Sequence, residues 1–153
     1  MFSVQVTKNS IPAMSEIAIN TVRELEKYIL ECPQTEIPTQ HIFHAGLYAR
    51  TIKIPAGVVL TGALIKIATF LVISGHCIIY VGEESFERKG YYPFAASANR
   101  KQAFVAIEDT YLTMVFPTDT KTVDEAERQF TDEFNCLSSR YDDAVNEIIV
   151  TGE

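Results

Sequence analysis

The stretch Thr69-Phe-Leu-Val-Ile-Ser-Gly-His-Cys-Ile-Ile-Tyr-Val81 decides the fold class of this chain. Its two ends are rich in the β-branched and aromatic residues that strands favour, and they flank Ser74-Gly75-His76. Glycine supplies the positive φ that a tight loop requires. The stretch therefore predicts a hairpin whose strands span residues 69–73 and 77–81.

Short strands continue on both sides of this hairpin, with turn residues between them. Residues 48–54 alternate between polar and apolar side chains, as a half-buried strand does, and Pro55-Ala-Gly57 ends them. The other expected strands are 58–60, 86–89, 91–94, 102–106 and 111–116. About eight short strands at this spacing are typical of an antiparallel sandwich or a small barrel.

Two amphipathic helices are expected outside the strands. The first lies between Ser15 and Glu31, and Pro33 ends it. Its apolar stripe is formed by Ala18, Val22, Leu25 and Ile29. The second begins at the capping box Thr122-Val-Asp-Glu125, in which a hydroxyl and a carboxylate satisfy reciprocal amides. The tail beyond Tyr141 is too apolar for a solvated terminus, so we expect it to pack on a sheet edge or on a neighbouring subunit.

The composition predicts one globular domain. The chain has 153 residues, is 47% apolar and carries a formal charge of −7. We expect an N-terminal segment and helix in residues 1–40, a barrel in 41–117, and a C-terminal helix and tail in 118–153. An acidic protein is a poor partner for nucleic acid or an anionic membrane, because both require a basic surface.

Neither secretion nor a membrane span is expected. The richest apolar stretch, residues 67–81, is interrupted by polar residues and falls short of the roughly 18 residues that a spanning helix needs. Residues 1–8 show no signal-peptide pattern. Three cysteines, none in a C-x-x-C spacing, predict free thiols in a reducing compartment.

No motif for catalysis stands out. The sequence lacks G-x-S-x-G, a P-loop and G-x-G-x-x-G. His41 and His44 form an H-x-x-H pair that could hold a metal on a helix, but Pro38 and Gly46 beside them favour extended backbone. Hydrogen-bonded or surface histidines are therefore the favoured interpretation, and an enzyme that uses this pair as metal ligands is a minor alternative.

A small-molecule site inside the barrel is a further hypothesis. The compact basic element Asn99-Arg100-Lys101-Gln102 is either an exposed strand start or an anion contact at the barrel mouth. The candidate ligand-binding residues are Arg50, Lys66, Arg100 and Lys101 for charge, with Tyr48, Tyr80, Phe94 and Phe104 as apolar walls. If Lys66 and Lys101 both point inward without acidic partners, a bound anion is implied. If Ile65 and Ile67 point inward instead, the barrel is filled.

Residues 50–116 resemble the cupin superfamily, whose members are small jelly-roll barrels that usually bind a metal inside. The glycines of the first cupin motif fall on Gly57 and Gly62 and continue to Ser74-Gly75. The ligand positions of the two motifs fall on Ala63, Ile65, Thr69 and Lys101. Side chains of these types cannot hold iron, manganese or zinc. The resemblance therefore implies a mainly β, cupin-like jelly roll with an N-terminal and a C-terminal helix, without metal, cofactor or enzymatic activity.

A closer resemblance is to small uncharacterised cupin-like proteins of tailed bacteriophages and prophages, over residues 32–132. The shared stretches include Glu36-Ile-Pro-Thr39, Gly46-Leu-Tyr-Ala-Arg-Thr-Ile52, Ile54-Pro-Ala-Gly57, Ala96-Ser-Ala-Asn-Arg-Lys-Gln102 and Phe116-Pro-Thr118. This resemblance implies a virion structural or assembly component of head or tail, found in the host cytoplasm or the virion. Such a protein would self-associate and contact other phage proteins. The alternative is a metal-independent binding protein for a small anionic or nucleotide ligand, such as a ligand-sequestering protein.

Overall fold

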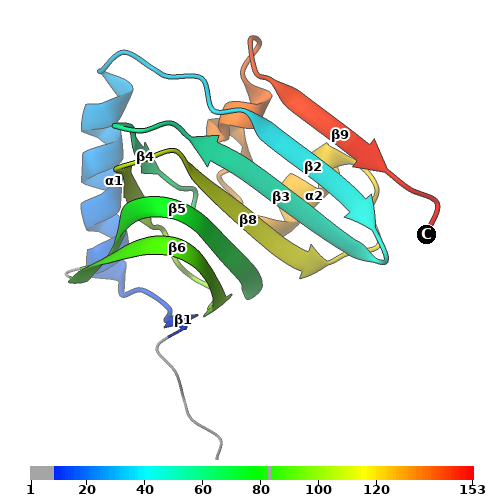
Figure 1. Ribbon diagram of the computed structural model, residues 1–153, viewed down its shortest axis with the longest axis horizontal. Helices are drawn as coiled ribbons and strands as arrows, with labels where there is room; N and C mark the ends of the chain where they lie inside the picture. The colour runs from blue at the N-terminus through cyan, green and yellow to red at the C-terminus, as the bar shows by residue number, and fades with distance from the viewer. Residues whose placement is uncertain (1–8, 83) are drawn as a thin grey trace, which may run out of the picture.

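The structure, a computed structural model, describes residues 9–82 and 84–153 (Figure 1). The strands are β1 (Ser10–Ile11), β2 (Thr39–His44), β3 (Leu47–Ile54), β4 (Val59–Thr61), β5 (Thr69–Val81), β6 (Glu84–Ala96), β7 (Ala103–Ala106), β8 (Thr110–Pro117) and β9 (Asn146–Val150). The helical segments are α1 (Glu16–Leu30), α2 (Val123–Phe130) and the 3-10 turns η1 (Phe134–Cys136) and η2 (Ser138–Arg140). The protein is thus mainly β, as the sequence predicts.

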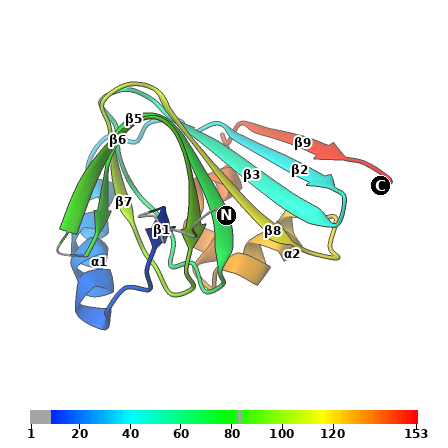
Figure 2. The same cartoon turned by 60° about the horizontal axis from the view of Figure 1, so that its bottom comes forward.

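The strands form one mixed sheet in the order β1-β6-β5-β8-β3-β2-β9, and β7 joins β5 to β4. The β1–β6 and β2–β9 pairs are parallel, and all other pairs are antiparallel. The sheet curls around its core, but within the described residues its order does not return to the first strand (Figure 2). The expected antiparallel barrel is therefore corrected to a curled mixed sheet, because a parallel strand is added at each end.

Strand β5 runs unbroken through the residues expected as a hairpin tip, so that prediction is wrong. Gly75 (φ +144°) pairs with Gly90 (φ +115°) of β6, which also continues through an expected turn. Positive φ serves here to bend two paired strands rather than to reverse one. Before the bend β5 pairs with β8, and after it with β7. The bend folds the sheet over its own concave face, as the arched ribbons of Figure 1 show.

The first expected helix is confirmed as α1. The hydroxyl of Ser15 accepts a hydrogen bond from the Ala18 amide at 3.1 Å, which caps the first turn. Buried residues on one face pack α1 against the sheet: Ala18, Ile19 and Val22, with Met14 before the helix. No helix of the described residues is long and apolar enough to cross a membrane. The expectation about a signal peptide rests on residues 1–8, which lie outside the described residues.

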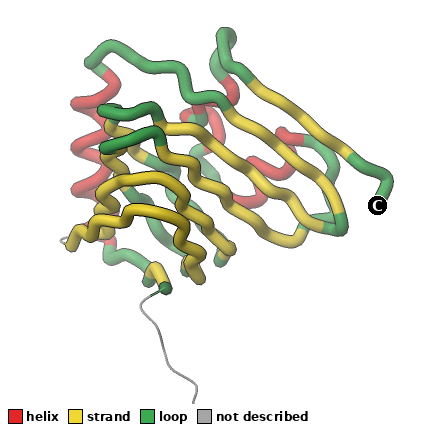
Figure 3. Tube along the Cα trace, viewed as in Figure 1, coloured by secondary structure: helices red, strands yellow, loops and turns green. Residues whose placement is uncertain are grey.

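The second expected helix is confirmed as α2, but one half of its capping box is replaced. The Thr122 hydroxyl accepts from the Glu125 amide at 3.4 Å, as expected. The Glu125 carboxylate accepts instead from the Thr120 hydroxyl at 2.5 Å. The expected packing of the tail on a sheet edge is confirmed, since β9 pairs with β2. In Figure 3, α1 stands at one side of the curled strands and the other helical segments lie behind β3 and β8.

Candidate functional site

A cavity of about 740 Å³ lies on the concave face of the curled sheet. The register places Arg50, Met114 and Leu71 side by side across β3, β8 and β5, and all three line it. Residues of β4 and β7 form a further part of the wall, with Leu60 and Phe104 among them. Because these strands present apolar side chains inward, most of the lining is apolar, as in small-molecule sites.

One end of the cavity is closed and the other is open to solvent. The lining residues at the closed end, such as Arg100, Phe104 and Phe130, are buried. The exposed lining residues come from the last turns of α1, the connector 32–35, residues 135–141, and Gly57 and Val59 at β4. These four segments therefore form the mouth, and Cys32 and Cys136 both lie there.

Arg100 brings a positive charge to the closed end. Its side chain is only 1% exposed, and its hydrogen-bond partners are neutral: the Ser97 carbonyl at 2.7 Å, the Thr69 hydroxyl at 2.7 Å, the Ile67 carbonyl at 3.4 Å and the Met114 sulfur at 3.8 Å. No carboxylate of the described residues pairs with it, and its Nε donates to none of their atoms. Burial lowers the pKa of Arg100 to about 10, so it stays charged at neutral pH.

Gln102 supplies a second free donor. The segment that holds both residues is extended and pairs with residues 62–65, because Ile65 bridges to Arg100 and the Gly62 amide donates to the Gln102 carbonyl at 2.8 Å. Residues i and i+2 of extended backbone face the same side, so Arg100 and Gln102 both line the cavity. Gln102 is 5% exposed, and its Nε2 has no hydrogen-bond partner among the described residues.

Arg50 also lines the cavity, but its charge is compensated. Its Nη1 donates to Glu127 Oε2 of α2 at 2.5 Å. Glu127 also accepts from the Ser139 hydroxyl and from Arg140 Nε at 2.8 Å. Burial alone would raise the pKa of Glu127, but these partners outweigh it and hold the pKa below its ordinary value. The pair therefore remains ionised at neutral pH and adds no net charge to the cavity.

A chain of hydrogen bonds continues from Arg50 to the edge of the sheet. Arg50 Nη1 lies 3.4 Å from the Tyr48 hydroxyl, which lies 2.6 Å from His41 Nδ1. His41 Nε2 lies 2.7 Å from Asn146 Oδ1 of β9. Asn146 Nδ2 donates to the Ser139 carbonyl, which turns its Oδ1 toward the ring, so His41 Nε2 carries the proton. Burial lowers the pKa of His41 and raises that of Tyr48 to about 12, so both are neutral at pH 7.

The histidine pair cannot chelate one metal ion. His41 and His44 stand three residues apart on β2, so their side chains point to opposite faces of the strand. Both ring nitrogens of His41 are engaged inside the fold, whereas His44 is exposed and bonds the Thr151 hydroxyl at 2.6 Å. The expectation of extended backbone here is confirmed.

The positions that correspond to the metal ligands of the cupin motifs do not fit a metal either. Ala63 and Ile65 line the cavity, the Thr69 hydroxyl accepts from Arg100, and Lys101 points elsewhere. None offers an imidazole, carboxylate or thiolate, and the guanidinium beside Thr69 would repel a cation. In residues 9–82 and 84–153 no three His, Cys, Asp or Glu side chains gather as a metal site would require.

Of the candidate ligand-binding residues, Arg50, Arg100 and Phe104 line the cavity, whereas Lys66, Tyr80 and Lys101 do not. Tyr80 is 39% exposed because it follows inward-facing Ile79 on β5. Lys66 is on the surface and pairs with Asp132 at 2.7 Å. The apolar candidates Tyr48 and Phe94 are buried in the core beside the cavity.

Lys101 is buried, but acidic partners surround it. Its Nζ lies 3.0 Å from Glu26 of α1 and 3.1 Å from Glu133. Neither Lys66 nor Lys101 therefore brings an unpaired positive charge into the cavity. Arg100 is the residue that does so. Ile65 does line the cavity, but it does not fill it.

Sequence patterns do not single out Glu26 and Glu127, and they include Gln102 only as a member of the basic element 99–102. Gln102 was visible as the i+2 neighbour of Arg100 in an extended stretch. The carboxylates could not be assigned, because Glu127 meets a partner 77 residues away in sequence.

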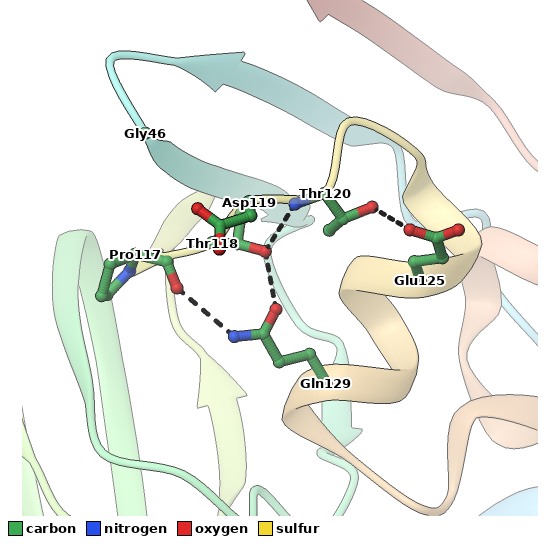
Figure 4. Close-up of a pocket in the computed structure, with 7 residues that line it drawn as sticks. All are labelled: Gly46, Pro117, Thr118, Asp119, Thr120, Glu125 and Gln129. Atoms are coloured by element: carbon green, nitrogen blue, oxygen red, sulfur yellow. Dashed lines mark hydrogen bonds between the residues drawn. The ribbon is translucent and has the colours of Figure 1, made fainter.

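A second hollow of about 490 Å³ lies where β8 leads into α2 (Figure 4). Its polar groups bond one another: the Thr118 hydroxyl donates to Gln129 Oε1 at 2.6 Å, and Gln129 Nε2 donates to the Pro117 carbonyl at 3.3 Å. The Thr120 amide donates to the Thr118 hydroxyl at 3.2 Å. Because these groups already have partners, the interior cavity is the stronger candidate site.

Comparison with known proteins gives only distant similarity. No family model matches the sequence, and no curated protein does. Among solved structures, a cupin superfamily protein from Desulfitobacterium hafniense has 10% identity and a TM-score of 0.47, over 75% of this chain and 100% of that one. KdgF from Halomonas sp. has 17% identity and a TM-score of 0.46, over 63% of this chain and 90% of that one.

A Cupin 2 conserved barrel domain protein from Salinispora arenicola has 15% identity and a TM-score of 0.45, over 60% of this chain and 84% of that one. The proteins from Desulfitobacterium hafniense and Salinispora arenicola bear the name of the fold family that the sequence resembles. At TM-scores below 0.5 they carry no argument about what this chain does.

Proposed function

We propose that the protein binds a small organic anion, without a metal, in the cavity of its curled sheet. The observation that carries this proposal is Arg100, a buried guanidinium with neutral partners and a free Nε, beside the free amide of Gln102. A buried donor left without a partner costs about 1–3 kcal/mol, and more when it is charged. An anion at the closed end would supply the missing acceptor and the missing charge.

The apolar lining supports an organic anion rather than a bare inorganic ion. If only a small ion were bound, the apolar side chains of the cavity would remain in contact with water. These are Ile52, Leu60, Leu71, Phe104 and Leu112. A ligand with an apolar body covers them and excludes water, and this strengthens its contact with Arg100. The proposal includes no chemical step.

Anilinonaphthalene sulfonate tests this proposal, because it is an apolar anion that fluoresces when it leaves water. We expect the native protein to bind it in a saturable way, and Arg100→Met to weaken binding roughly ten- to hundredfold through loss of a charged hydrogen bond. Lys66→Met is the matched control, because it removes an exposed cation that does not line the cavity. Its binding should equal that of the native protein.

Gln102→Leu is a second variant in case Arg100→Met does not fold, which circular dichroism would reveal. It keeps the shape of the side chain and removes the free amide, so it should also weaken binding. The neutral analogue phenylnaphthylamine should not respond to either substitution. Equal binding of the sulfonate to the native protein, Arg100→Met and Gln102→Leu would contradict the proposal.

A second proposal is the role in a phage virion or its assembly that the sequence resemblance implies, through contacts between copies of this chain. Its support is the apolar surface along β9 and α1, where Ile148 is 55% exposed and Ile17 is 74% exposed. Edge strands with exposed apolar residues are suited to strand pairing between subunits. Light scattering should then give a defined oligomer that Ile148→Lys dissociates; a monomer at all concentrations would oppose this role.

A further inference from the structure

We infer that the ligand is an apolar monocarboxylate and that the cavity discriminates against dianions, including phosphate monoesters and nucleotides. This inference rests on the proposed function and names its ligand class. Three features carry it: the net charge of the groups around the cavity, the number of free donors, and the apolar lining.

The positive charges that line the cavity belong to Arg50 and Arg100. Arg50 is paired with Glu127, whose second oxygen is held by Arg140. Arg140 in turn pairs with Asp124 at 2.8 Å. Arg50 therefore adds no net charge, and Arg100 is the cavity-lining cation that lacks a compensating carboxylate among the described residues.

A second negative charge on the ligand would meet repulsion near α1. Glu26 lines the cavity, and its partner Lys101 is shared with Glu133. One lysine between two carboxylates leaves this cluster with a net charge of −1. A monoanion balances Arg100, whereas a dianion would bring an uncompensated charge into a poorly solvated site beside that cluster.

Two donor atoms are free, one for each oxygen of a carboxylate. Arg100 Nε and Gln102 Nε2 are buried donors without a partner among the described residues, and both residues line the cavity. The other guanidinium nitrogens are engaged by Ser97, Ile67, Thr69 and Met114. A phosphate monoester has three terminal oxygens, so two donor atoms would have to serve three oxygens in an apolar site.

Three competitors with the same eight-carbon chain differ in the charge of the head group: octanoate, octyl phosphate and octanol. Their affinities therefore report the effect of charge on binding. Each would compete with the bound fluorescent sulfonate at about pH 8, where the phosphate is a dianion because its second pKa is about 6. We expect octanoate to bind at least roughly tenfold more tightly than octanol. Octyl phosphate should bind more weakly than octanoate, and AMP should not displace the probe.

Two internal controls use the same compounds. At about pH 5.5 octyl phosphate is largely a monoanion, so its affinity should rise relative to octanoate. In Glu127→Gln, Arg50 loses its counter-charge, and the cavity gains a second positive charge. The affinity of octyl phosphate at pH 8 should therefore rise relative to that of octanoate. If this variant does not fold, the competition measured on the native protein at the two pH values still tests whether the cavity prefers a monocarboxylate.

Failure of the inference and failure of the proposed function give different results. Octyl phosphate or AMP displacing the probe more strongly than octanoate at pH 8, with binding still dependent on Arg100, would overturn the monocarboxylate and leave the anion site intact. Octanol matching octanoate in the native protein, with no effect of Arg100→Met on any competitor, would overturn both.

Discussion

Arg50 and Glu127 form a buried ion pair that joins the sheet to the helix behind it, with Nη1 and Oε2 2.5 Å apart. Because Glu127 also accepts from Ser139 and Arg140, the pair holds α2 and η2 against β3. Phe130 and Ser138 of these segments line the cavity. The shape of the candidate site therefore depends on one carboxylate that does not itself line it.

Glu127→Gln should destabilise the fold by about 3–5 kcal/mol, since it leaves Arg50 buried without a counter-charge. Asp132→Asn is the control, because the Lys66–Asp132 pair is exposed and contributes at most about 1 kcal/mol. Urea unfolding of both variants measures the difference. If Glu127→Gln lowers the free energy of unfolding as little as Asp132→Asn does, the buried pair contributes no more to stability than a surface pair.

Stability should fall as the pH drops below the ordinary histidine pKa of 6.5, because of His41. Burial lowers its pKa in the folded protein, so between that lowered value and 6.5 the unfolded chain binds more protons than the folded one. The free energy of unfolding therefore rises with pH across this window. The Glu127 carboxyl, whose folded pKa is also lowered, adds a second loss only below its ordinary value of 4.5.

Urea unfolding of His41→Gln at pH values from about 5 to 8 isolates the histidine contribution. This variant should be less stable at neutral pH, since it loses the ring's hydrogen bonds, but its stability should vary less with pH. His44→Gln, which removes the exposed histidine on the opposite face of β2, is the comparison variant. If the free energy of unfolding of His41→Gln varies with pH as steeply as that of the native protein, other groups cause the loss of stability at low pH.

Gly75→Ala should destabilise the protein by more than Gly46→Ala, although both glycines have positive φ. A Cβ at Gly75 would lie 2.6 Å from the Asp109 carbonyl oxygen and 2.7 Å from Thr110 Cα, both of the backbone. A Cβ at Gly46 meets nothing within 4 Å, so that variant bears only the conformational cost of about 1–2 kcal/mol. Thermal unfolding of both variants measures the difference, and equal losses would mean that the bend at Gly75 has room to relax.

Two of the three thiols should react with a thiol reagent in the folded protein. Cys32 and Cys136 are exposed at the mouth, whereas Cys77 is buried and its pKa is raised to about 11 by burial. Cys77 should react only after unfolding. Octanoate should slow the labelling of the two mouth thiols, and mass spectrometry of the labelled protein would identify each site. Labelling of Cys77 at the same rate would contradict its burial.

Local signals in the sequence predicted the helices better than the strand connections. Ser15 and Thr122 mark both helix starts because a cap acts within three residues. Gly75 signals positive φ equally well for a turn and for a bend, and only its pairing with Gly90 decides between them. The two expected hairpin strands are therefore one strand.

The basic residues of the candidate site could be predicted from the sequence, but their partners could not. Arg100 and Lys101 are neighbours in one basic run, but extended backbone sends them to opposite sides. Lys101 meets Glu26 and Glu133, and Arg100 meets no carboxylate of the described chain. Which of the two stays uncompensated depends on partners brought together by the fold, and no local pattern records them.

The parallel pairing of β9 with β2 has a consequence for how fast the protein folds. Asn146 reaches His41 across 105 residues of sequence, and β9 pairs with β2 along the whole of this distant contact. Contacts between such distant residues require long loops to close before any pairing compensates for the lost chain entropy. We therefore expect folding in milliseconds to seconds, as is usual for β proteins rich in distant contacts, with slower folding than a helical protein of this length.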